Sequence, residues 1–163
     1  MKKLCIFLIL TFFIVACNSQ VQEYSFGRKL RLTKQNDTSF VLTHIINDSL
    51  VDSFKFNYKV LKFSFCYLDE DSVPEVLVMV NKKTRFWPQY DNRLFVYKLY
   101  EGRLIRPLWL GSKLCGELLD FSVKNDTFPN LIITDCIFNN KREKMKFSLG
   151  GFGLKYCGKE SYE

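Results

Sequence analysis

The stretch FKFNYKV, from Phe54 to Val60, indicates the fold class, because aromatic or apolar residues alternate in it with polar ones. Alternation with a period of two places the aromatic side chains on one face of a β-strand. After Val60 the phase changes, and Leu61, Phe63 and Phe65 become the apolar positions. A shift of one residue turns every following side chain to the opposite face. We therefore expect a β-bulge or a bend near Val60 and Leu61.

The composition of the whole chain also favours strands over helices. Alanine, which has the highest helix propensity, occurs once, at Ala16. The chain is instead rich in Phe, Tyr, Val, Ile and Thr, which suit a pleated, half-buried surface. Turn residues separate short apolar segments, and this pattern predicts an antiparallel all-β domain. Besides the opening stretch, strands are expected at Phe26–Leu32, Ser39–Ile46, Val76–Val80, Leu94–Tyr100, Gly102–Trp109, Leu118–Val123, Asn130–Asp135, Lys144–Leu149 and Gly153–Cys157.

A weak internal repeat refines this expectation. Leu68–Val78 aligns with Val123–Ile133 at an offset of 55 residues, and Leu94–Leu99 aligns with Lys144–Leu149 at an offset of 50. The difference falls in a segment expected to be a loop, Lys82–Asn92, which is longer in the first copy. A period near 50 residues is typical of blade-like β repeats. We therefore expect an antiparallel sheet domain built from two degenerate blade-like repeats plus N-terminal strands, arranged as part of a propeller or as a sandwich.

The N-terminus has the pattern of an export signal. The basic start Met1–Lys3 is followed by an uncharged run of 13 residues from Leu4 to Ala16. A membrane-spanning helix needs ~20 apolar residues, so this run better suits the core of a signal peptide. The alternatives are a buried apolar helix and a signal peptide that is cut elsewhere.

The residues Ile14-Val15-Ala16-Cys17 resemble the lipobox of bacterial lipoproteins. The resemblance implies that residues 1–16 are removed and that Cys17 is acylated, which anchors the protein to a membrane. Asn18, in place of an aspartate, then implies the outer membrane of the cell envelope. We expect a short tether at residues 17–23 and a single all-β domain at residues 24–163.

A second resemblance concerns the acidic stretch Asp69-Glu70-Asp71-Ser72-Val73-Pro74-Glu75-Val76. It resembles the Asp-Gly-Asp-Gly-x-Pro-Glu-Leu signature of FG-GAP/VCBS-type repeats, in which spaced acidic side chains bind calcium. Asp69, Asp71 and Glu75 match acidic positions and are weak candidate metal ligands. Tyr67 replaces an upstream acid, and both glycines are missing. Calcium takes six to eight oxygen ligands, so we expect no metal or cofactor here, but a turn in which the Asp side chains bond their own backbone.

Catalytic signatures are scarce. The single histidine, His44, lies on the same face as Phe40 and Leu42, which indicates a partly buried strand residue. There is no Gly-x-Ser-x-Gly motif and no phosphate-binding Gly-rich loop followed by Lys and Ser or Thr. We therefore expect a protein that is not an enzyme.

Four cysteines remain once Cys5 is removed with the signal peptide and Cys17 is lipidated. An even number in an exported protein favours at least one disulfide. Cys136 and Cys157 are the first candidate pair. Zinc binding and buried free thiols are the alternatives, although no Cys-x-x-Cys spacing is present. The disulfide candidates are Cys66, Cys115, Cys136 and Cys157.

A binding surface is the main functional candidate. The segment Lys82–Asn92 contains basic and aromatic side chains of the types that dominate protein interfaces. The candidate contact residues are Phe86, Trp87, Tyr90 and Trp109, unless Phe86 and Trp87 instead plug the core. The formal charge of +7 falls to +5 without Lys2 and Lys3, and the basic residues form no dense block. Because the lipobox resemblance implies an exported lipoprotein, we expect no nucleic-acid partner.

Two functions remain open at this point. The first is a membrane-anchored, non-enzymatic envelope lipoprotein that acts as a binding or structural module, with the membrane and another envelope protein as partners. The alternative is a glycan-binding or glycan-processing module that uses aromatic and acidic residues. The second requires an exposed aromatic platform beside Asp or Glu.

Overall fold

The structure, a computed structural model, describes residues 19–85, 87–111 and 113–161. The described residues form twelve β-strands and no helix, so none of them belongs to a helix that could span a membrane. The strands are β1 Ser19–Ser25, β2 Arg28–Asn36, β3 Ser39–Ile46, β4 Ser49–Phe56, β5 Lys59–Cys66, β6 Glu75–Thr84, β7 Trp87–Tyr100, β8 Leu104–Trp109, β9 Glu117–Lys124, β10 Leu131–Phe138, β11 Lys141–Gly150 and β12 Gly153–Glu160. The expected signal peptide at residues 1–16, the expected lipidation site Cys17 and the candidate contact residue Phe86 lie outside the described residues.

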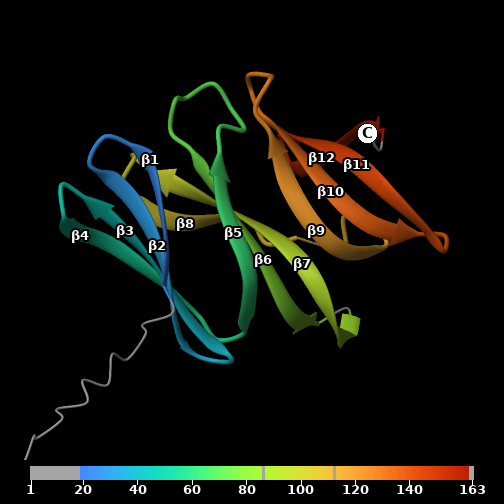
Figure 1. The fold of residues 1–163 in the computed structure, drawn as a ribbon, viewed down its shortest axis with the longest axis horizontal. Helices are drawn as coiled ribbons and strands as arrows, with labels where there is room; N and C mark the ends of the chain where they lie inside the picture. Colours follow the sequence, from blue (N-terminus) through green and yellow to red (C-terminus); the bar gives the residue numbers. More distant parts are fainter. Residues whose placement is uncertain (1–18, 86, 112, 162–163) are drawn as a thin grey trace, which may run out of the picture.

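Three four-stranded antiparallel sheets stand side by side, as Figure 1 shows. In each sheet the strands follow one another in chain order: β1–β4 form the N-terminal sheet, β5–β8 the middle sheet and β9–β12 the C-terminal sheet. The expected all-β antiparallel class is confirmed. The two repeat copies fall in the middle and C-terminal sheets, and the N-terminal strands form a third sheet of the same kind.

The middle sheet is apolar on both faces. Val76, Val78 and Val80 of β6 belong to a first core against the N-terminal sheet, while Leu77 and Met79 belong to a second core against the C-terminal sheet. The aromatic rings predicted to share a face pack in the first core, where Phe54 and Phe56 contact Tyr97. This two-sided burial explains the continuous apolar run of β6.

The expected β-bulge is confirmed, since the register of β5 against β6 shifts between Val60 and Lys62. The alternation from Phe54 to Val60 nevertheless spans two strands, because the chain turns at residues 57–58. The polar residue Asn57 fits the alternating pattern and also a turn, so the pattern did not reveal the break.

Two sequence-based boundaries need correction. The expected loop Lys82–Asn92 is instead the end of a long β6–β7 hairpin, in which Thr84 pairs with Trp87. Residues 19–23 of the expected tether instead belong to β1, which begins at Ser19 and pairs with β2 over Leu30 and Leu32. In both places β pairing continues through polar residues that resemble loop sequence.

Because successive strands are antiparallel, the turns of the first two sheets lie alternately at two opposite ends of the molecule. The start of β1, the β2–β3 and β4–β5 turns and the tip of the β6–β7 hairpin lie at one end, the lower one in Figure 1. We call this the basic end and define it as residues 19–20, 34–40, 56–60 and 82–91. The opposite end is the acidic end, defined as residues 23–29, 46–49, 67–75 and 98–103.

Candidate functional site

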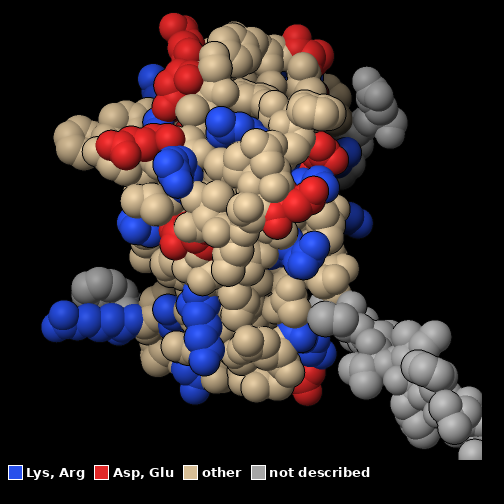
Figure 2. Space-filling view, turned by 90° about the vertical axis from the view of Figure 1, so that its left-hand side faces the viewer, with Lys and Arg blue, Asp and Glu red and all other residues tan. Residues whose placement is uncertain are grey.

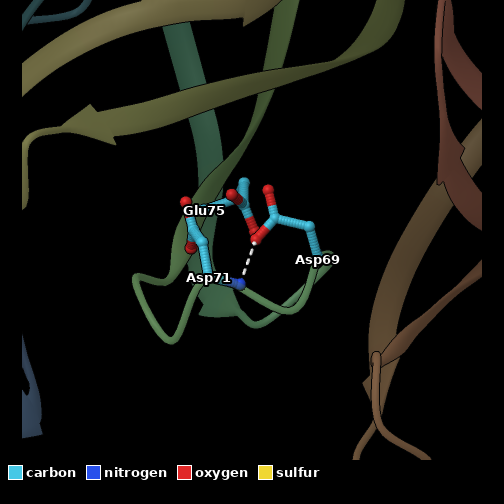
Figure 3. A group of neighbouring side chains, drawn as sticks. All are labelled: Asp69, Asp71 and Glu75. Carbon is cyan, nitrogen blue, oxygen red and sulfur yellow. Dashed lines mark hydrogen bonds between the residues drawn. The ribbon is translucent and has the colours of Figure 1, made fainter.

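The loop between β5 and β6 brings the three candidate metal ligands together. One carboxylate oxygen from each of Asp69, Asp71 and Glu75 lies within 4.8 Å of the other two, and Figure 3 shows the side chains turned toward one another. Asp69 accepts a hydrogen bond from the Asp71 N–H at 3.1 Å, and Asp71 accepts one from the Val73 N–H at 2.9 Å. The predicted turn in which Asp side chains bond their own backbone is therefore confirmed.

Ser72 occupies a position at which the resembling repeats have glycine. Its φ of 62° lies in the left-handed region, which residues other than glycine and asparagine rarely adopt. The loop thus keeps the sharp turn of the signature without its glycine.

A lysine from a neighbouring strand lies among the carboxylates. Lys98 of β7 pairs with Glu75 in the sheet, and its ammonium nitrogen is 2.9 Å from Asp69 Oδ2, 2.5 Å from Asp71 Oδ2 and 3.8 Å from Glu75 Oε1. The hydrogen bonds that Lys98 donates lower the pKa of Asp71, and the same contacts raise the pKa of Lys98. Because the three oxygens face an ammonium group and are too few for calcium, the residues present do not fit a calcium ion.

Glu75 is the buried member of this group. Its side chain is fully inaccessible, and Oε2 accepts a hydrogen bond from the Leu68 N–H at 2.8 Å, while Oε1 has no hydrogen-bond partner among the described residues. Burial raises the pKa of Glu75 to about 7. No sequence pattern predicted this burial, because an acid after a proline looks like part of an exposed turn.

The second repeat copy contains an uncharged counterpart. Asn130 aligns with Glu75 and is also buried. Its side chain accepts a hydrogen bond from the Tyr67 N–H at 2.9 Å and donates one to the Thr127 carbonyl at 2.8 Å, while its own N–H donates to the Tyr67 carbonyl at 2.7 Å. The two loops are therefore bonded directly to each other.

His44 is fully buried rather than partly buried. Its Nδ1 lies 2.7 Å from the Arg103 carbonyl, which requires a proton on that nitrogen, and its Nε2 lies 2.6 Å from the Tyr24 hydroxyl, which therefore donates. Burial lowers the pKa of His44 and favours the neutral ring. These bonds connect the N-terminal sheet to the β7–β8 turn, so the role of His44 is structural.

The four candidate cysteines are free thiols, and the expected Cys136–Cys157 pair is wrong. Cys136 is buried in the second core on β10, whereas Cys157 is exposed on β12, with β11 between them. Strands two apart lie roughly 9–10 Å from each other, too far for a disulfide. Cys115 packs against the core that contains Cys136, and burial, followed by the neighbouring Cys136 sulfur, raises the pKa of Cys115 to about 12.

The candidate contact residues separate into two places. Trp87 and Tyr90 are exposed at the hairpin, with 41% and 68% of their surfaces accessible, so Trp87 does not plug the core. Lys113 lies 4.7 Å from the Trp87 ring centre, and Lys83 lies 4.8 Å from that of Tyr90. Trp109 is elsewhere: it pairs with Val96 and packs partly against the second core.

Charge differs between the two ends of the molecule. The basic end contains five cations and two carboxylates, and Figure 2 shows Lys and Arg concentrated over the lower part of one face. The acidic end contains seven carboxylates and four cations. The sequence did not reveal this separation, because residues far apart in the chain meet at each end.

No protein-family model, curated protein or solved structure matches the chain. The contacts of the side chains themselves must therefore support any functional proposal.

Proposed function

We propose that this protein is a non-enzymatic lipoprotein of the bacterial cell envelope, held on the outer membrane by acyl chains on Cys17. Its β domain is a binding or structural module. The observation that carries the proposal is the position of the lipobox cysteine, which is separated only by Asn18 from Ser19, the first residue of β1. A folded domain that begins directly after an acylated cysteine is held close to the membrane surface.

The contacts of the titratable groups support a non-enzymatic role. His44 has a structural partner on each ring nitrogen, and Glu75 bonds to the backbone of its own loop. Lys98 offsets the charge of the nearby Asp69 and Asp71. In this arrangement the titratable side chains stabilise the turns, and the exposed β6–β7 hairpin is the candidate binding surface.

The geometry of the hairpin favours binding over glycan processing. Glycoside hydrolysis uses a pair of carboxyl groups on either side of the bond that is cut. Lys113 lies over the Trp87 ring and Lys83 over the Tyr90 ring, so each exposed ring has a cation beside it. We therefore rank contact with an anionic partner above glycan processing.

Replacement of Cys17 by serine tests the anchor. The variant should incorporate no labelled fatty acid, and it should leave the membrane fraction or accumulate as an uncut precursor. Cys157→Ser is the matched control, since it removes an exposed thiol from the folded domain. Fatty-acid labelling of the Cys17→Ser protein would refute the proposal.

The expected membrane has a separate test. The lipobox resemblance implies that Asn18 permits transfer to the outer membrane, so Asn18→Asp should retain the protein in the inner membrane. Density-gradient separation of the two membranes measures the change. An unaltered distribution of the variant would contradict the sorting part of the proposal.

A further inference from the structure

The basic end combines charge from three separate chain segments. Among its described residues, the cations are Lys34, Lys59, Lys82, Lys83 and Arg85, and the carboxylates are Asp37 and Asp91. Asp37 is bonded to Lys34 at 2.6 Å, and the side chain of Asp91 is largely buried beside Arg93. The exposed charge of this end is therefore positive, which suits an anionic partner.

Exposed aromatic rings stand among these cations. Trp87 lies at the start of β7 and Tyr90 further along the same strand, so both project from the hairpin that extends beyond the body of the middle sheet. Trp and Tyr are enriched at membrane–water interfaces, where the ring contacts acyl chains and the polar atom stays near the headgroups. Exposed aromatic rings beside lysines are thus the chemistry expected at a lipid interface.

The start of the described chain gives the orientation. Ser19 pairs with Thr33 beside the β2–β3 turn, which places the entry of the chain at the basic end. Cys17 is two residues earlier, and two residues span at most roughly 7 Å. An acyl group on Cys17 therefore holds this end, rather than the acidic end, against the bilayer.

We propose that the basic end is a membrane-contact surface whose partner is a phospholipid bilayer with anionic headgroups. Its lysines lie against the headgroups, and Trp87 and Tyr90 enter the boundary between headgroups and acyl chains. The orientation rests on the proposed acylation of Cys17, whereas the charge and the exposed rings do not. The acidic end then faces away from the membrane.

The chain contains two tryptophans, and this permits a direct test. In the lipidated protein in phosphatidylcholine–phosphatidylglycerol vesicles, Trp109→Phe leaves Trp87 as the reporter, and Trp87→Phe leaves Trp109. Brominated acyl chains should quench Trp87 strongly and Trp109 weakly, because Trp109 packs against the second core. Equal quenching of both, or no quenching of Trp87, would overturn the proposal. If Trp109→Phe fails to fold, the difference between the wild type and Trp87→Phe gives the Trp87 signal.

A second measurement isolates the electrostatic part. The unlipidated Cys17→Ser protein should sediment with vesicles that contain phosphatidylglycerol and much less with pure phosphatidylcholine. Reversing Lys59 and Lys83 to glutamate should weaken this binding roughly tenfold or more, since each basic residue contributes to attraction near a charged surface. Reversing Arg103 and Lys155, which are exposed outside the basic end, changes net charge equally and should have a much smaller effect. An equal loss in both double variants would show attraction by net charge alone and would refute the surface.

The two proposals fail in different ways. If fatty acid labels Cys17 but Trp87 is not quenched, the anchor stands and the contact surface is wrong. If Cys17 is not labelled but the unlipidated protein binds anionic vesicles through Lys59 and Lys83, the surface stands and the anchor is wrong.

Discussion

The β5–β6 and β9–β10 loops occupy equivalent positions in their sheets but satisfy neighbouring backbone groups by different means. Glu75 accepts the Leu68 N–H with a carboxylate, and Asn130 accepts the adjacent Tyr67 N–H with an amide. In the middle sheet Lys98 pairs with Glu75. The repeat aligns Lys98 with Ser148 in the C-terminal sheet. The lysine and the buried acid occur together, and both are replaced in the second copy.

This difference shows that two adjacent backbone N–H groups of the β5–β6 loop have a charged solution, Glu75 of the same loop, and a neutral solution, Asn130 of the β9–β10 loop. The neutral solution needs only Asn130 and its two partners. The charged solution also needs a cation to offset the carboxylates, which makes the first loop sensitive to pH and to the loss of one distant residue.

The largest effect is expected for Lys98→Met, which removes the cation and keeps an unbranched side chain of similar length. Three carboxylates then face one another, one of them buried, so we expect a loss of about 2–4 kcal/mol in the free energy of unfolding near neutral pH. This value is reduced from that of a fully buried pair because Lys98, Asp69 and Asp71 are partly exposed. Urea unfolding measures it, with Lys155→Met as the control. The loss should shrink near pH 5, where Glu75 is protonated, and a loss that does not change with pH would refute the charged account.

Glu75→Gln tests the same loop by removing the buried acid instead of the cation. Burial raises the pKa of folded Glu75 from its usual 4.5 to about 7, so the folded state binds the proton more tightly than the unfolded state between these values. The wild type should therefore lose stability relative to Glu75→Gln as the pH rises through this range, by roughly 1–3 kcal/mol. Gln keeps an acceptor for the Leu68 N–H. If the difference in the free energy of unfolding between the two proteins did not change with pH, the raised pKa of Glu75 would be contradicted.

His44 adds to the stability of both proteins a pH dependence that has the opposite sign to that of Glu75. Burial lowers its pKa, so stability falls as the pH drops below the usual value of 6.5 and the ring of the unfolded chain takes up a proton first. This contribution is common to the wild type and to Glu75→Gln, and it cancels in their difference.

A smaller loss, without pH dependence, is expected for Asn130→Ala. The change leaves the Tyr67 N–H without its acceptor and should cost about 1–2 kcal/mol. Asn125→Ala, on an exposed residue of the same loop, is the control. If the loss in Asn130→Ala changed with pH, the distinction between a charged and a neutral acceptor would be contradicted.

No effect is expected from calcium. A ligand that binds only the folded state raises the melting temperature, but Lys98 already lies among the oxygens that calcium would need. Millimolar calcium chloride should therefore shift melting no more than magnesium chloride does. A rise specific to calcium and absent in Asp71→Ala would reverse this conclusion.

The features that the sequence predicted depend on local patterns. Alternation predicted the strands, the phase change at Val60 predicted the bulge, and the Asp-rich turn predicted bonds to its own backbone. Lys98 was missed because its position among the acids follows from strand register, which brings β7 beside β6. The burial of Glu75 was missed because side chains from two sheets exclude water there, and no local pattern records that.

The chain-order arrangement of the strands has a consequence for synthesis. Every strand hydrogen-bonds only to its neighbours in the chain, so hairpins can form soon after they emerge. The middle sheet, however, exposes Leu77 and Met79 until the last four strands arrive to cover them. A nascent chain that ends after β8 therefore presents an apolar sheet face with open edges, and such surfaces are prone to aggregate. This interval is when an escorting chaperone would matter most to the protein.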